Sequence, residues 1–454
     1  MPLDSGLTLA LKPSVRLSEA GGLEEPGRKR LRLAAAGAAQ QGFLRALAAG
    51  ASTEEELCRG RLELRYLLAQ LEQEGWISYS LARGGRVLAT LEPLAREFRF
   101  RPAGDGSWRL SRFAWIRRLE AGAVLENPLG FGRVLLLEPE LLEALGRLCR
   151  PQTADSLALP GLAGAFLAML ASAGAVAPSA EEGTLPEDRA PALRQWEFHD
   201  LLFHGRSRQG SHGNPVGASF RFLGELAPLP ALKPAHPDPI PLPEPCPPRP
   251  DVTFFSVLEA RRSIRVPGPD PITLAQLGTF LHHVARIRQV APVDPGAGRF
   301  YEAVSGPCPG GGGLHEIELY LTVSRCAGLA PGFYHYAAGT HRLEPWPGSE
   351  AAGELLRRAA QAMGPAPAPD ILFTLAARVQ RVSWKYQTIA YSLILKNTGV
   401  LYQQMYLVAT ALGLAPCAIG TGDSQLFARA SGLEFTREAS VGEFALSGGA
   451  GPGR

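Results

Sequence analysis

A proline-rich stretch at 226–250, LAPLPALKPAHPDPIPLPEPCPPRP, limits what this chain can fold into more than any other feature of its sequence. Proline lacks the backbone donor that helices and central strands need, and runs of proline hold the chain extended. We therefore predict that a helix followed by a semi-rigid connector occupies 186–250 and separates two parts of the protein. The C-terminal part, 251–454, would then fold as a domain of its own.

The composition of the 454 residues is typical of a globular protein, with 46% hydrophobic and 20% charged residues. The formal net charge of +3 is too small to favour nucleic acid as the main partner. The six cysteines form no CxxC pair, which argues against a zinc ribbon and favours reduced thiols in a cytoplasmic protein. The uncharged segment 156–180 is long enough to cross a membrane, but its proline, glycines and alanines favour a soluble helix and no membrane partner.

Residues 1–100 are predicted to form a small winged-helix-like module. The strand-like segments LTLAL at 7–11 and RLRL at 30–33 are expected to pair, and three helical segments follow them. A hairpin closes the module, because WISYSL and RVLATL flank two glycines. Residues 101–185 repeat this order of elements, with FAWIRRLEAGAVLENP and RVLLL as the hairpin, and we interpret them as a degenerate second module.

Winged helices often bind DNA, but the charge of the third helical segment, 61–74, argues against DNA here. The segment carries two arginines and three glutamates: Arg61, Arg65, Glu63, Glu72 and Glu74. Its net charge of −1 has the wrong sign for a helix that contacts phosphates. The same shape can bind a peptide, because an extended peptide can join an exposed strand edge. Peptide binding and a purely structural role both remain open for the two modules.

The C-terminal part carries motifs whose residue types suit an anionic, flat ligand. RRSIR supplies two adjacent guanidinium groups and a hydroxyl, from Arg261, Arg262 and Ser263, which fit a phosphate; a solvated basic helix end is the alternative. PGGGGLHEIELYL at 309–321 contains four glycines that would let the backbone approach a flat ring. A flexible loop is the alternative, and a P-loop is excluded because no GK[ST] follows. The adjacent histidines at 282–283 cannot bind one metal ion as a helical i, i+4 pair would, so no metal site is predicted.

One long helix is predicted from about 389 to 412, with Gly413 as its stop signal. Its apolar residues lie on nearly all sides, which predicts burial, and a second subunit would supply part of the cover. Lys385 and Tyr386 stand just before this helix. Adjacent residues do not share a helix face, so we expect the pair in non-helical backbone. PCAIGTGD at 416–423 adds a second glycine-containing loop after the helix.

In this order, RRSIR, PGGGGLHEIELYL, SWKYQTIAYSLILKNTG and GLAPCAIGTGD resemble the nitroreductase superfamily, and within it the SagB-like azoline dehydrogenases. The likeness covers about 250–448, and the N-terminal modules resemble the peptide-binding domains attached to azoline oxidases. The resemblance implies an α+β fold and a homodimer with FMN at the subunit interface. It also implies oxidation of thiazoline or oxazoline rings to azoles in a ribosomally synthesised precursor peptide, after another enzyme, such as a partner cyclodehydratase, has made the rings.

The resemblance also assigns roles to individual residues. The FMN phosphate and ribityl chain would be held by Arg261, Arg262, Ser263 and Arg265. The flavin would be lined by Gly312, Gly313, Leu314 and Glu316, and approached near its reactive nitrogen by Ala418, Ile419 and Gly420. Lys385 and Tyr386 match the catalytic pair of azoline oxidases, and the Lys385 ammonium would favour the phenolate of Tyr386 as the base. In one departure from many nitroreductases, the C-terminal FALSGGAGPGR has no basic residue before Arg454.

Two other functions remain open on the sequence alone. A generic FMN nitro- or quinone reductase would be fed by NAD(P)H, although no dinucleotide fingerprint is visible. A non-catalytic scaffold would bind leader peptides and recruit other maturation enzymes. The first would carry a flavin that NADPH reduces, and the second would carry no flavin at all.

Overall fold

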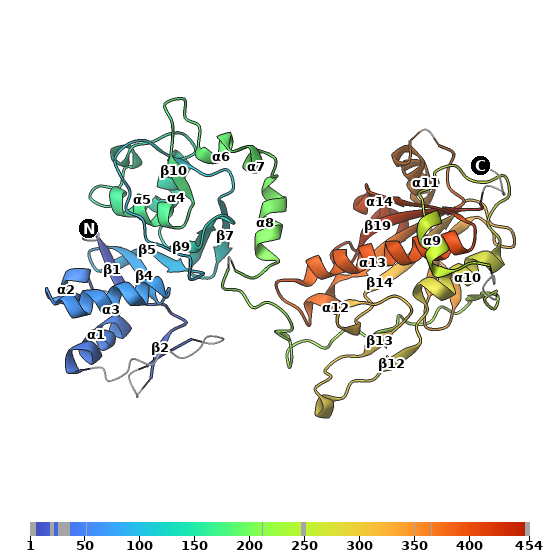
Figure 1. The fold of residues 1–454 in the computed structure, drawn as a ribbon, viewed down its shortest axis with the longest axis horizontal. Coiled ribbons are helices and arrows are strands. Elements are labelled where there is room, and N and C mark those ends of the chain that lie inside the picture. The colour runs from blue at the N-terminus through green and yellow to red at the C-terminus, as the bar shows by residue number, and fades with distance from the viewer. Residues whose placement is uncertain are drawn as a thin grey trace. The chain divides into compact units, whose positions relative to one another are not determined.

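The protein divides into two compact units, 1–214 and 215–454, in a computed structural model (Figure 1). The structure describes residues 6–18, 22–25, 37–50, 52–210, 212–246, 251–348, 350–364 and 366–449. The division falls before the proline-rich stretch because the described part of that stretch packs on the second unit. There, the backbone carbonyls of Pro230 and Ala231 accept hydrogen bonds from Arg378, and Ile240–Pro241 forms a short strand, β11.

The described part of the first unit is built on a six-stranded antiparallel sheet in the order β1-β4-β5-β9-β8-β7. Its strands are β1 (Leu7–Leu11), β4 (Ile77–Arg83), β5 (Arg86–Pro93), β7 (Trp115–Leu119), β8 (Gly122–Glu126) and β9 (Gly132–Leu136). The first predicted hairpin is confirmed as β4–β5. In the second, RVLLL forms β9 and pairs with β8 as expected, but FAWIRRLEAGAVLENP divides into two paired strands, β7 and β8. Strand β1 pairs with β4, whereas its expected partner at 30–33 lies outside the described residues.

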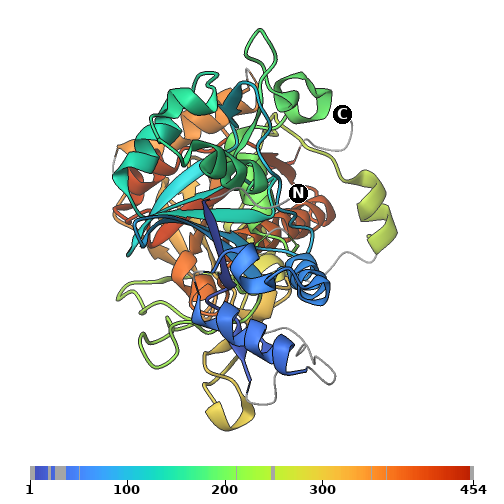
Figure 2. The same ribbon diagram turned by 90° about the vertical axis from the view of Figure 1, so that its left-hand side faces the viewer.

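Helices cover the sheet of the first unit in two groups (Figures 1 and 2). The first group is α1 (Ala38–Ala49), α2 (Glu54–Cys58) and α3 (Leu62–Gln73), and the second includes α4 (Pro139–Arg147) and α5 (Ala163–Ser172). Strands from 7–93 and from 115–136 share one sheet and one hydrophobic core. The smaller elements are β2 (Arg16–Leu17), β3 (Leu23–Glu24), β6 (Trp108–Leu110), η1 (Ala154–Leu157), β10 (Val176–Pro178), α6 (Pro186–Arg189), α7 (Pro191–Arg194) and α8 (Phe198–Arg206).

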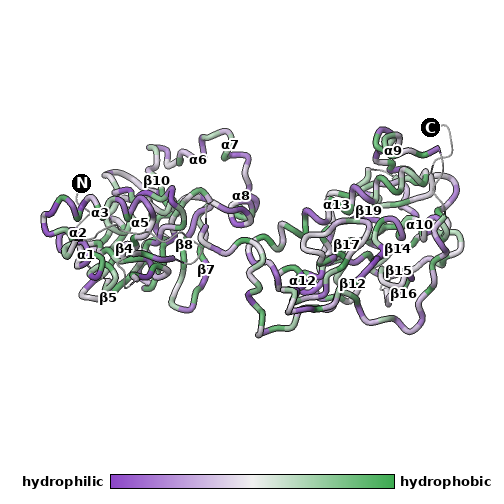
Figure 3. The backbone as a smooth tube through the Cα atoms, turned by 60° about the horizontal axis from the view of Figure 1, so that its bottom comes forward, coloured by the Kyte–Doolittle hydropathy of each residue, from purple (hydrophilic) through white to green (hydrophobic). Residues whose placement is uncertain are grey.

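Hydrophobic and hydrophilic residues alternate over short distances through both units (Figure 3). The apolar segment 156–180 is divided between η1, α5 and β10 rather than forming one long helix. In the part of the chain that the structure describes, no helix is long and apolar enough to cross a membrane.

The second unit has an antiparallel sheet in the order β11-β16-β15-β14-β17-β19-β18. Its longer strands are β14 (Ile317–Val323), β15 (Gly332–Ala337), β16 (Arg342–Pro345), β17 (Ile371–Arg378), β18 (Ala415–Ile419) and β19 (Glu438–Ser447). Strand β17, between β14 and β19, is buried along its whole length, as its continuous apolar character predicts. Two helical layers on this sheet confirm a mixed α+β architecture.

One helical layer packs α10 (Leu274–Ala285) and α13 (Ala390–Ala411) on the sheet, and the other packs α11 (Ala351–Ala362) and α14 (Ser424–Ser431). The long helix predicted at 389–412 is thus confirmed. The remaining elements are α9 (Phe254–Ala260), β12 (Gln289–Ala291), η2 (Pro295–Ala297), β13 (Ala303–Ser305), η3 (Gly311–Gly313) and α12 (Val379–Ser383). The β12–β13 hairpin and η3 bring chain segments from outside the sheet to the N-terminal end of α13.

Candidate active site

Lys385 and Tyr386 lie in the non-helical backbone between α12 and α13, as the sequence predicts. The segment that follows residue 215 covers them. The backbone N–H of Phe220 donates to the Lys385 carbonyl at 3.2 Å, and Trp384 Nε1 donates to the Leu226 carbonyl at 2.7 Å. These contacts hold the backbone of the pair at one place on the second unit.

The amine of Lys385 is nearly buried, with 9% of the residue exposed. Its Nζ donates a hydrogen bond to Tyr301 Oη at 2.5 Å and lies 4.5 Å from the centre of the Tyr301 ring. It also lies 5.0 Å from the centre of the Tyr386 ring. The sequence did not point to Tyr301, because this residue is 84 positions from Lys385 and belongs to no recognised motif.

The glycine loop meets this pair at Gly312. With φ of 67°, Gly312 adopts a left-handed conformation that side chains other than glycine rarely adopt. A Cβ atom at Gly312 would lie 2.6 Å from Tyr386 Oη and 2.7 Å from Lys385 Nζ. The two polar atoms therefore converge on the same point of the loop. Glycine is required at this position both for its backbone conformation and for the room it leaves.

Arg381 holds the same loop in place through hydrogen bonds to the backbone. It is 3% exposed, and its guanidinium donates to three backbone carbonyls, those of Leu229, Glu302 and Leu314. The Leu314 side chain is itself buried in the core beside Trp384. The loop that carries Gly312 is thus held by a buried cation and by an anchored leucine.

Asn397 of α13 links the glycine loop to Glu316. Its Oδ1 accepts from the Gly311 N–H at 3.1 Å, and its Nδ2 donates to Glu316 Oε1 at 2.8 Å. Glu316 is 1% exposed, its Oε2 has no hydrogen-bond partner among the described residues, and burial raises the pKa of its carboxyl group. Asn397 lies inside the KNTG motif, but nothing in the sequence showed that its side chain would bridge these two positions.

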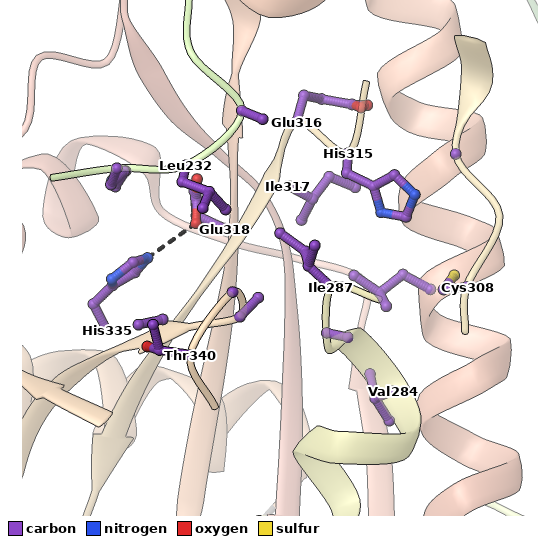
Figure 4. Close-up of a pocket in the computed structure, with 18 of the residues that line it drawn as sticks. Leu232, Val284, Ile287, Cys308, His315, Glu316, Ile317, Glu318, His335 and Thr340 are labelled. Atoms are coloured by element: carbon purple, nitrogen blue, oxygen red, sulfur yellow. Dashed lines mark hydrogen bonds and ion pairs between the residues drawn. The ribbon is translucent and has the colours of Figure 1, made fainter. Parts of the chain in front are cut away.

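A cavity of about 200 Å³ opens beside Glu316 (Figure 4). Cys308 and His315 lie on one side of it, and Glu318 and His335 on the other. Burial raises the pKa of the Cys308 thiol to about 11, so the cavity offers no thiolate nucleophile at neutral pH. Among the described residues, no group of three or more histidine, cysteine or acidic side chains is arranged to hold a metal ion.

His335 binds two carboxylates at the far side of this cavity. One ring nitrogen hydrogen-bonds Glu344 Oε2 at 2.8 Å and the other Glu318 Oε2 at 3.0 Å. Burial alone would lower the pKa of His335, but the hydrogen bonds to these carboxylates and their charge outweigh burial and raise it. The histidine is therefore held as part of a charged network in the wall of the cavity.

The RRSIR motif lies beside β18 and forms a second group. Ser263 Oγ hydrogen-bonds Tyr406 Oη at 2.7 Å, and Tyr406 Oη also accepts from the Ala418 N–H at 2.8 Å. The guanidinium of Arg261 lies 5.3 Å from the centre of the Tyr406 ring. Two more of the predicted residues, Arg262 and Arg265, are exposed. The sequence missed Tyr406, which joins the two predicted motifs through one hydroxyl.

The predicted site residues therefore form two groups within one chain. The first joins the glycine loop to Lys385 and Tyr386, and the second joins 261–265 to the start of the 418–420 loop. Asn397 of the first group and Tyr406 of the second stand nine residues apart on α13, which is about 14 Å along the helix axis. Ile419 is buried against the layer of α11 and α14, so its side chain does not face the RRSIR motif.

Comparison with protein families gives two matches. Residues 108–213 match the cyanobactin oxidase ThcOx family, and residues 258–448 match the nitroreductase family. A curated relative, a putative nitroreductase of Methanocaldococcus jannaschii, is 27% identical over 170 residues, which cover 37% of this chain and 79% of the relative.

Solved structures give further matches at low identity. A putative nitroreductase from Anabaena variabilis is 21% identical, with 38% of this chain and 34% of that chain covered and a TM-score of 0.33. This protein thus spans about a third of the length of that structure. The Escherichia coli microcin synthetase McbBCD complex with truncated pro-MccB17 bound is 19% identical, with 55% and 91% covered and a TM-score of 0.35. A putative nitroreductase in complex with FMN from Exiguobacterium sibiricum is 13% identical, with 45% and 91% covered and a TM-score of 0.30.

Proposed function

We propose that this chain, an oxidoreductase, oxidises azoline rings to azoles in a ribosomally synthesised peptide. The premise is its pair of domains: a nitroreductase-family domain at 258–448 and a cyanobactin oxidase domain at 108–213. The pairing of these two domains supports a peptide substrate over a free small molecule. The observation that carries the chemistry is the convergence of Lys385 Nζ and Tyr386 Oη on Gly312 in a nearly buried site.

The residues present fit FMN as the cofactor. The second group offers the Ser263 hydroxyl and the exposed guanidinium groups of Arg262 and Arg265, which suit a phosphate. The glycine loop offers backbone without side chains, as close approach to a flat ring requires. We propose that the phosphate binds near 261–265 and that the flavin ring lies along the loop at Gly312.

We further propose that two copies of the chain form a homodimer with FMN at their interface. Helix α13 supports this arrangement, because it separates the two groups of site residues and exposes large apolar side chains. Tyr391, Leu395 and Val400 are 47%, 39% and 42% exposed. A second copy would bury these side chains, and their burial would contribute favourably to association.

Oxidation of an azoline to an azole removes two hydrogens from the ring, one as a proton and one as a hydride. FMN, when bound, supplies the acceptor for the hydride and its electron pair. We propose that Lys385 and Tyr386 receive the proton, because their polar atoms are adjacent to the loop, with Lys385 buried and Tyr386 partly buried. The buried Arg381 holds the glycine loop in position beside this pair through a hydrogen bond to the Leu314 carbonyl.

The substitution Lys385→Ala tests this assignment. General acid–base catalysis contributes about 10²- to 10⁴-fold, so we expect at least a 100-fold loss of azole formation while the flavin stays bound. Lys12→Ala is the control, because Lys12 pairs with Glu25 in the first unit and should leave turnover within about two-fold of the wild type. Full turnover by Lys385→Ala would reject the role of the pair.

The same preparation separates the two alternatives. Flavin that NADPH reduces under anaerobic conditions, with no oxidation of an azoline peptide, would identify a generic reductase. A colourless protein that does not take up added FMN would support the scaffold. The precursor peptide and a cyclodehydratase remain the proposed partners, and co-purification with each would test them separately.

A further inference from the structure

Tyr301 makes two hydrogen bonds through one hydroxyl group. It donates to the Gly312 carbonyl at 2.7 Å and accepts from Lys385 Nζ at 2.5 Å. A carbonyl oxygen can only accept, so the phenolic hydrogen of Tyr301 must point toward Gly312. Toward Lys385, the phenol oxygen can therefore act only as an acceptor, and the amine must present an N–H to it.

This geometry fixes the direction of the Lys385 amine. The hydrogen bond directs one N–H of Lys385 Nζ at Tyr301 and thereby orients the rest of the amine. The lysine side chain has a flexible four-carbon stem, which would otherwise let Nζ sample many positions. The contact with Tyr301 ties Nζ to the carbonyl of Gly312, which is the glycine on which Nζ and Tyr386 Oη converge.

The position of Tyr301 is itself held by the surrounding fold. The residue is 9% exposed and packs in a core cluster that includes Leu314 and Trp384. Its neighbour Glu302 is fixed twice: its carbonyl accepts from Arg381 Nη2 at 3.0 Å, and its Oε2 accepts from the Ala231 N–H at 2.6 Å. Because Tyr301 is anchored in this way, its hydroxyl can hold the end of the flexible Lys385 side chain in place.

We propose that Tyr301 is a positioning residue, which aims the Lys385 amine at the reacting ring by bridging it to the Gly312 carbonyl. The proposal rests on the proposed function for the role of Lys385. Under this proposal the glycine loop positions both the Lys385 amine and the flavin, because the flavin ring would lie along the same loop.

The test is the Tyr301→Phe variant of the full-length protein, with Tyr334→Phe as the matched control. Tyr334 is a buried tyrosine of the same unit, 6% exposed, whose hydroxyl also donates to a backbone carbonyl, that of Ala330, at 2.9 Å. We expect Tyr301→Phe to lower kcat by about 10- to 100-fold with KM within about two-fold and flavin content unchanged. Tyr334→Phe should keep both constants. Unchanged kcat in Tyr301→Phe would overturn the proposal.

A second measurement does not depend on turnover. Limited acetylation with acetic anhydride, followed by peptide mass spectrometry, reports how available the Lys385 amine is. Without its acceptor the amine is less fixed and more available to the reagent, so its labelling should rise at least about three-fold in Tyr301→Phe and stay constant in Tyr334→Phe. Equal labelling in all three proteins would contradict the contact. Full turnover by Lys385→Ala would instead reject the proposed function, whatever the labelling shows.

Discussion

Replacing Gly312 with alanine should disconnect the glycine loop from Lys385 and Tyr386 without removing either side chain. The new methyl carbon would lie 2.6 Å from Tyr386 Oη and 2.7 Å from Lys385 Nζ. Ordinary contacts begin at 3.4 Å, so the loop or the pair must shift by about 0.8 Å. A misplacement on the order of 1 Å at a reacting centre costs about 100-fold in rate. The left-handed backbone adds about 1–2 kcal/mol of destabilisation.

Gly298→Ala is the matched control for this prediction. Gly298 has φ of 71°, almost the same as Gly312, but a Cβ there would meet no atom within 4 Å. Both variants therefore carry the same backbone cost, and only Gly312→Ala collides with the pair. Any difference between them isolates the collision from the strain.

The assay measures azole formation per bound flavin, together with the free energy of unfolding from urea titration. Both variants should lose about 1–2 kcal/mol of stability, while only Gly312→Ala should lose about 100-fold in kcat. Equal kcat in the two variants would refute the view that the loop and the pair form one site.

Two further substitutions test the second group of residues and the buried charge next to it. Tyr406→Phe removes the hydroxyl shared by Ser263 and the Ala418 N–H, and should raise the Kd for FMN about ten-fold in a fluorescence titration; an unchanged Kd would separate Tyr406 from the cofactor. Burial, with a smaller contribution from Asp423, raises the pKa of Glu443 to about 7 from 4.5, so between these pH values the folded chain binds a proton that the unfolded chain releases. Stability should therefore fall as pH rises from about 4.5 to 7, and Glu443→Gln should flatten this fall and add up to about 3 kcal/mol at pH 8. Parallel urea-unfolding profiles for Glu443→Gln and the wild type would contradict this assignment.

Local patterns in the sequence predicted the elements that depend on local interactions. The helix expected at 389–412 is found at Ala390–Ala411, because its apolar periodicity and the glycine stop are properties of the segment itself. The hairpin around Gly84 and Gly85 was predictable for the same reason. The non-helical position of Lys385 and Tyr386 followed from their adjacency in the sequence.

Contacts between distant segments were not predictable in this way. Strand β1 pairs with β4, about 70 residues away, and no periodicity in either strand specifies that partner. Tyr301 and Tyr406 reach the site through hydroxyl groups that join separate motifs, and a single tyrosine carries no pattern. The proline-rich stretch was expected to connect two parts, but its carbonyls are acceptors for Arg378, a partner that only the folded sheet supplies.

Anaerobic mixing of the purified protein with an azoline-containing peptide tests the central claim most directly. The account predicts that the flavin absorbance bleaches without NAD(P)H, and that each flavin reduced corresponds to one ring that has lost two hydrogens by mass spectrometry. A flavin that stays oxidised in the presence of this peptide, or a protein that carries no flavin and takes none up, would contradict it.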